Sequence, residues 1–189
     1  MTKGLKILLI VVAVIVIFGM FVIKGLNEVV VKHESVAAAW AQVENQLQRR
    51  NDLIPNLVET VKGYMEHEKN LLIEITRLRS QWGDAKTAED KIEAAKDMTQ
   101  ALGRLLLVVE QYPDLKANQN FLTLQAQLEG TENRIAVERM RYNSAVQNFN
   151  KFIRTIGGSI AARLRGLLKA EAYFEAEDAA KQVPRVSFK

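Results

Sequence analysis

Between residues 36 and 82, apolar residues recur at alternating spacings of four and three. This average repeat of 3.5 residues keeps one face of an α-helix against a neighbour, as in left-handed bundles and coiled coils. Only Arg50 and Glu68 place charged side chains on this face, and we interpret both as residues that fix register or reach the edge of the packing. The stretch therefore predicts a long packing helix. Its face positions are Val36, Trp40, Val43, Leu47, Arg50, Ile54, Leu57, Val61, Tyr64, Glu68, Leu71, Ile75, Leu78 and Trp82.

Two further stretches have the same spacing and set the fold class. The 189 residues include only 10 Gly and 3 Pro, few for a β-rich chain. We expect an all-α fold, in which an N-terminal transmembrane helix continues into a long antiparallel, up-and-down bundle of three long helices and a shorter C-terminal helix. We also expect Gly157 and Gly158 to end the third helix and Ser159 to cap the fourth. The expected long helices are about 28–82, 87–111 and 117–156.

Pro55 is the one interruption expected within the first of these helices. Proline removes a backbone donor and costs about 3 kcal/mol in a helix interior, yet it is tolerated in a first turn. Asn51 and Asp52, just before it, are residue types that cap helix N-termini well. The first helix is therefore predicted either to kink near residues 51–55 or to restart there.

The N-terminal segment is apolar enough to cross a membrane. Residues 7–23 carry no charge, and residues 5–23 as a helix reach about 29 Å, close to the roughly 30 Å of a hydrocarbon core. A signal peptide is the alternative, since Lys3 and Lys6 precede the segment, but no small-x-small cleavage site follows it. We therefore expect an uncleaved anchor. The expected domains are an anchor over 1–25, a bundle over 26–157, and a basic amphipathic segment with an extended tail over 158–189.

The charges around this segment favour an N-terminus in the cytoplasm. Lys3, Lys6 and the terminal amine precede it, whereas the two lysines that follow it up to residue 34 are offset by two glutamates. We therefore expect a single-pass protein of a bacterial inner (plasma) membrane with its helical domain outside the cytoplasm.

Residues 134–169 are strongly basic, with eight Lys or Arg and the single acidic residue Glu138. A membrane anchor and the absence of a recognised motif disfavour nucleic acid as a partner. Residues 160–169 suit a basic amphipathic helix that binds anionic lipid, although counting residues along the helices places them far from their own membrane, so that contact would be in trans. A charged contact with another copy or a partner protein is the favoured interpretation. The candidate contact residues are Arg154, Arg163, Arg165 and Lys169.

The same count of residues along antiparallel helices leaves part of the first helix uncovered. The second and third helices are too short to reach the packing face before Pro55. An apolar stripe left in water forgoes about 1.5–3 kcal/mol for each large side chain. We expect neighbouring copies to cover this stripe as a homo-oligomer, and the alternative is a chain break near Asn51 that lets the tail cover it. The expected oligomer interface is Val36, Trp40, Val43 and Leu47.

Motifs that carry chemistry are scarce. The chain has no Cys, which excludes disulfides, thiolate ligands and cysteine nucleophiles. It has only 2 His, so few residues could serve as metal ligands. Neither His33 nor His67 follows a Glu by three residues, as a di-metal bundle site requires. Gly157 and Gly158 lack the Lys-Ser/Thr of a phosphate loop. We therefore predict no catalytic residues, no cofactor and no metal site, and a protein that is not an enzyme.

Several short motifs follow one another along the chain. They are Trp-Ala-Gln-Val-Glu at 40–44, Arg-Arg-Asn-Asp-Leu-Ile-Pro-Asn-Leu-Val-Glu-Thr-Val-Lys-Gly-Tyr at 49–64, His-Glu-Lys at 67–69, Tyr-Pro-Asp-Leu-Lys-Ala-Asn at 112–118, Phe121, Thr-Glu-Asn-Arg-Ile-Ala at 131–136, Tyr142-Asn143 and Tyr-Phe-Glu at 173–175. In this order they resemble the LemA family of single-pass bacterial membrane proteins. The resemblance implies an N-terminal anchor and a helical bundle that is either cytosolic or extracytoplasmic, and it supplies no active site. Ile156-Gly157 and Ala172 depart from the family's usual residues near the C-terminus.

Two functions are compatible with these features. The first is a membrane-anchored helical scaffold of the bacterial envelope that self-associates through its juxtamembrane helix. The second is a tethered adaptor that presents the bundle to another envelope protein or, in trans, to anionic lipid.

Overall fold

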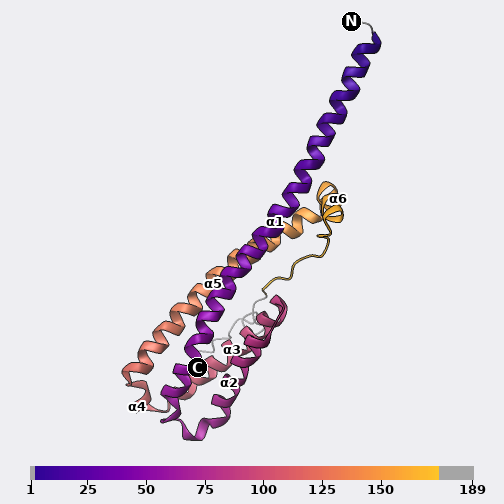
Figure 1. Ribbon diagram of the computed structural model, residues 1–189. Coiled ribbons are helices and arrows are strands. Elements are labelled where there is room, and N and C mark those ends of the chain that lie inside the picture. The colour runs from indigo at the N-terminus through magenta and orange to yellow at the C-terminus, as the bar shows by residue number, and fades with distance from the viewer. Residues whose placement is uncertain (1–2, 175–189) are drawn as a thin grey trace, which may run out of the picture. The chain divides into compact units, whose positions relative to one another are not determined.

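The computed structural model describes residues 3–174, and every regular element in that range is helical, which confirms the predicted all-α class (Figure 1). The described residues form two compact units, a first unit of residues 3–39 and 141–173 and a second unit of residues 40–140 and 174. The expected extended tail lies outside the described residues. The elements are α1 (Lys3–Lys62), a 3-10 turn η1 (Glu66–Glu68), α2 (Lys69–Asp84), α3 (Ala88–Val109), α4 (Pro113–Lys116), α5 (Gln119–Ile153) and α6 (Ile156–Arg165).

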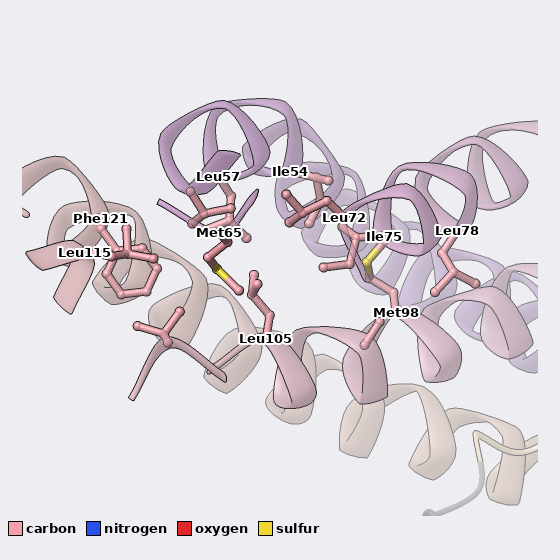
Figure 2. Close-up of a cluster of buried hydrophobic side chains, with 13 residues drawn as sticks. Ile54, Leu57, Met65, Leu72, Ile75, Leu78, Met98, Leu105, Leu115 and Phe121 are labelled. Carbon is pink, nitrogen blue, oxygen red and sulfur yellow. The ribbon is translucent and has the colours of Figure 1, made fainter. Parts of the chain in front are cut away.

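The second unit is a helical bundle whose core lies between α1, α2, α3 and α5. The 3.5-residue spacing of each helix places its apolar side chains on one face, and these faces meet. Figure 2 shows the buried side chains pointing toward one another from all four helices and from the short α4. The largest members are Ile54, Leu57, Met65, Leu72, Ile75, Leu78, Met98, Leu105, Leu115 and Phe121.

The predicted single helix from 28 to 82 is wrong, because the chain turns between α1 and α2. The backbone N–H groups of Tyr64 and Met65 both donate to the carbonyl of Val61, at 3.0 Å each, and close the last turn of α1. The buried Met65 side chain then fills the core where the spacing predicts Tyr64, which is exposed. A helical hairpin and one long helix both need apolar residues every three or four positions, so the spacing alone does not separate them.

Pro55 lies inside α1 without ending it, so the predicted restart near Asn51 is wrong. In an unbroken helix the carbonyl of Asn51 accepts from the N–H of residue 55, which proline lacks. The structure supplies another donor, because Nε of Arg79 on α2 lies 3.4 Å from that carbonyl. The hairpin of α1 and α2 thus places the Arg79 side chain where it can donate to the carbonyl that Pro55 leaves without a backbone donor.

The boundary between α5 and α6 also differs from the prediction. α5 ends at Ile153, and Thr155 caps α6 by accepting a hydrogen bond from the backbone N–H of Gly158 at 3.0 Å. Gly157 and Gly158 therefore belong to the first turn of α6 and do not end the preceding helix. Ser159 is not the cap, since its hydroxyl donates to the carbonyl of Ile156.

Candidate functional site: the apolar span and the helix beside it

The N-terminal part of α1 is one exposed apolar surface. Among the described residues, α1 is the single helix that is long and apolar enough to cross a membrane, and none of its most apolar 18-residue window is buried within the protein. Its large side chains between Leu5 and Ile23 are exposed, except that of Val22, which is half-buried. The first unit therefore presents a lipid-compatible cylinder over the residues that the sequence predicts as the anchor.

α6 packs directly against the end of this apolar segment, within the same unit (Figure 1). A Cβ built on Gly25 would lie 3.8 Å from the Cβ of Ala161, and one on Gly157 would lie 3.8 Å from the ring of Phe21. Small residues on both helices thus allow their backbones to approach closely. The approach buries Gly158, Ala161 and Ala162.

A second face of α6 is apolar and exposed. Ile156, Ile160 and Leu164 follow one another at intervals of four and are 85%, 57% and 65% exposed. A groove of about 460 Å³ separates this face from α1, and its lining includes Phe18, Phe21, Ile160 and Leu164.

Two of the four predicted basic contact residues lie on α6 and the other two lie just before and just after it, and all four are exposed. Their predicted distance from the anchor is wrong, because α6 contacts Phe21 and Gly25 of its own chain. The residue count assumed a first helix that continues to Trp82. In the structure α5 instead returns along α1, where the ring of Phe149 lies 5.5 Å from that of His33. The basic residues themselves are Arg154, Arg163, Arg165 and Lys169.

The segment after α6 is fastened back onto α5 by buried polar side chains. Asn150 donates to the carbonyl of Glu171 at 2.9 Å and accepts from its backbone N–H at 3.0 Å. The Tyr142 hydroxyl donates to the carbonyl of Ala172 at 3.0 Å, and the Glu171 carboxylate lies 3.6 Å from Nε2 of His33. Sequence reasoning missed Asn150, because it lies between the apolar residues Phe149 and Phe152 and is itself polar.

Arg50 is the centre of a buried polar cluster in the second unit. Its guanidinium donates to Oγ1 of Thr99 at 2.8 Å and to the carbonyl of Ala95 at 2.9 Å, both on α3, and to the Glu132 carboxylate of α5 at 3.0 Å. Burial lowers the pKa of Arg50 below its ordinary value, and the attraction of Glu132 offsets part of that shift. The cluster joins three helices at one level, as expected of a residue that fixes register.

The predicted oligomer interface is not available at the surface. Val36, Val43 and Leu47 are 5%, 0% and 2% exposed in the chain by itself, and Trp40 is half-buried. The two ends of this stripe are next to residues that contact α5, since His33 packs on Phe149 and Arg50 pairs with Glu132. The prediction that other copies must cover the stripe is therefore wrong, because the turn after Lys62 changes which helices lie beside α1.

Within residues 3–174, no group of three or more His, Asp or Glu side chains is placed to hold a metal ion. The buried polar residues of this range are hydrogen-bonded to the helices or to the segment after α6; they are Arg50, Thr131 and Asn150. These hydrogen bonds stabilise the fold.

A helical bundle whose first helix begins as an exposed apolar span defines a class of all-α proteins suited to a membrane. The chain belongs to the LemA family, whose sequence profile matches residues 39–188.

Three curated relatives resemble the chain over most of its length. Protein LemA of Metamycoplasma hominis is 25% identical over 153 residues, which cover 80% of this chain and 69% of the relative. Magnetosome protein MamQ 2 of Paramagnetospirillum magneticum is 26% identical over 179 residues, with 81% and 65% covered. Magnetosome protein MamQ of Magnetospirillum gryphiswaldense is 23% identical over 175 residues, with 79% and 64% covered. The chain thus spans slightly less than two thirds of the MamQ proteins.

Proposed function

We propose that the protein is a single-pass membrane protein that works by binding and not by catalysis, and that it presents its bundle to another protein of the bacterial envelope. One observation carries the membrane part of this proposal. α1 begins as an exposed apolar segment and continues, without a linker, as a core helix of the bundle. In water each large apolar side chain of that segment would forgo about 1.5–3 kcal/mol of burial, whereas a bilayer accommodates all of them.

The binding role is supported by where the buried polar groups are used. The hydrogen bonds of Arg50, Asn150 and Tyr142 hold the helices and the segment after α6 in place. Because these buried polar groups serve the structure, we expect the protein to act through its exposed surfaces, by binding a partner. Self-association through residues 36–47 does not fit the structure, because Val36, Val43 and Leu47 are buried within the chain.

Extraction of native membranes tests the anchor. We expect the full chain to stay with the membrane in alkaline carbonate and to leave it only with detergent. Replacing Val14 and Ile17 by Arg should release the protein, since each charge at the centre of a span costs about 2.5–3.5 kcal/mol on insertion scales. Replacing the exposed Ile73 and Leu107 of the second unit by Arg is the matched control and should leave the protein in the membrane.

Photo-crosslinking in cells tests the adaptor role. A photoreactive residue at the exposed positions Ile73 or Leu107 should give adducts with a different envelope protein. A photoreactive residue at the exposed Val31 of the first unit reports contacts nearer the membrane. If these positions give adducts only between copies of the chain, the protein is a self-associating scaffold and the adaptor proposal fails.

The proposed topology places the bundle outside the cytoplasm, on the basis of the charges beside the span. Glu28 lies 3.4 Å from Lys32, so part of the positive charge after the span is paired. The chain has no native cysteine. A single cysteine at the exposed Gln147 should therefore react with a membrane-impermeant maleimide in spheroplasts, and reaction only after lysis would place the bundle in the cytoplasm.

A further inference from the structure

We propose that α6 is an interfacial helix that docks on the membrane holding its own anchor, and that its basic residues bind anionic lipid headgroups there. This inference rests on the proposed membrane anchor and adds a lipid class and a surface to it. It concerns only the first unit, whose parts contact one another directly.

The position of α6 is the first argument. It lies close to α1 at Phe21 and Gly25, in the last turn of the uncharged segment and just after it. With residues 5–23 in the hydrocarbon, this level lies where the acyl chains meet the headgroups. A helix packed there is adjacent to the membrane from the moment the anchor is inserted.

The direction of the apolar face is the second argument. Ile160 and Leu164 line a groove together with Phe18 and Phe21 of the span. Phe18 is a span residue, so the exposed face of α6 shares a surface with side chains that themselves require lipid. A mostly apolar surface, whose groove also includes Lys24 and Glu28, then runs from α1 onto α6, and acyl chains of the adjacent leaflet can cover its apolar parts.

The charge of the segment selects the kind of lipid. Residues 151–170 carry five Lys or Arg and no acidic residue. Arg163 lies next to the apolar face by helical position, and long basic side chains beside an apolar face reach the headgroup region while their stems stay in contact with the acyl chains. Anionic headgroups, such as phosphatidylglycerol, complement this arrangement better than zwitterionic ones.

Fluorescence of labelled single-cysteine variants tests the docking. The cysteine-free full chain is reconstituted in nanodiscs of phosphatidylcholine and phosphatidylglycerol, with an environment-sensitive dye on Ile160→Cys or Leu164→Cys. We expect blue-shifted emission at both positions and strong quenching by lipids that carry a spin label in the upper acyl chain. The matched control is Gln147→Cys on α5, which is exposed in the same unit and should show several times less quenching.

Val14→Cys, in the middle of the span, separates this inference from the proposed function. Quenching at Val14 by a deep spin label without quenching at Ile160 and Leu164 would overturn interfacial docking and leave the anchor intact. No quenching at Val14 would overturn the anchor itself. Blue-shifted emission at Ile160 without lipid quenching would mean that protein covers the face, and would also overturn docking.

Neutralising the charge tests the lipid class. Arg163→Gln and Arg165→Gln should each weaken docking by about fivefold in discs with phosphatidylglycerol, as expected for a basic residue near an anionic surface. In discs of phosphatidylcholine alone the same changes should have little effect. Equal effects in both lipids, or none in either, would overturn the assignment of anionic headgroups.

Discussion

Single buried polar residues hold segments together that are far apart in sequence. Arg50 is 3% exposed and bonds to Thr99, Ala95 and Glu132, whereas the Glu132 side chain is 41% exposed. Removing one partner therefore leaves the other in a different environment in each case. Without Arg50 the carboxylate can be solvated, but without Glu132 a guanidinium stays buried beside two neutral acceptors.

Substitutions at this pair should have unequal effects on stability. We expect Glu132→Leu to lower the free energy of unfolding by about 2 kcal/mol, since it leaves a buried charge without its counterion. Arg50→Met should change it by less than about 1 kcal/mol, because an apolar residue of similar length can fill the site. Urea denaturation of the full chain in mild detergent measures both. Glu129→Leu, an exposed carboxylate on the same helix, is the control.

Gly158 is required for a steric reason that its neighbour does not share. A Cβ at Gly158 would lie 1.9 Å from the carbonyl oxygen of Phe152, whereas one at Gly157 meets nothing closer than 3.8 Å. We expect Gly158→Ala to disrupt the first turn of α6 and to speed tryptic cleavage after Arg163 and Arg165. Gly157→Ala should leave cleavage unchanged or slow it, since alanine favours a helix by about 1 kcal/mol over glycine. Equal cleavage of the two variants would contradict this explanation.

At the scale of elements, α1 and α2 compensate for each other's sequence. α1 contains a proline that removes one backbone donor, and α2 folds back so that Arg79 reaches the carbonyl of Asn51. The hairpin therefore reduces the cost of keeping Pro55 inside a 60-residue helix.

A double-mutant cycle tests this compensation. Pro55→Ala should raise the free energy of unfolding by about 2 kcal/mol, because it restores a backbone hydrogen bond and removes a clash. Arg79→Ala should lower it by about 1 kcal/mol in the native background and have almost no effect beside Pro55→Ala. Arg77→Ala, an exposed arginine of the same helix, serves as control. Additive effects of the two changes would show that the Arg79 contact does not serve the proline.

The helices and their packing faces could be predicted from the sequence, because the spacing of apolar residues determines which side of each helix is buried. The all-α class, the apolar N-terminal segment and the core positions Ile54 and Leu57 follow from it. The turn at Met65 could not, since helices on either side of a tight turn keep the same spacing. That one turn decides which helices neighbour α1, so the uncovered stripe and the distant position of α6 were wrong for a single reason.

At the scale of the whole molecule, the chain covers its own juxtamembrane stripe. Val36, Val43 and Leu47 are buried without any second copy. Most of the large exposed apolar side chains of the first unit belong to the span and to the face of α6. The surface that another molecule would have to cover therefore lies at the level proposed for the membrane and not at residues 36–47.

Thiol protection measures whether the stripe is covered within one chain. We expect Val43→Cys and Leu47→Cys to resist maleimide in the folded full chain and to react in urea. Val31→Cys, exposed on the same helix, should react at once. The protection should persist when the protein in detergent is diluted, and protection that is lost on dilution would indicate that a second copy covers these residues.

The hydrogen bonds that hold the segment after α6 on α5 determine which positions tolerate substitution. Asn150 makes its paired hydrogen bonds to the backbone of Glu171, and Tyr142 donates to the backbone of Ala172. Main-chain groups are the same for nearly every amino acid, so this anchorage recognises the route of the polypeptide and not its side chains. A substitution at 171 keeps these backbone hydrogen bonds but loses the contact of the Glu171 carboxylate with His33. Variation at 172 should accordingly be accepted far more freely than variation at 150, where only an amide side chain of that length both donates and accepts.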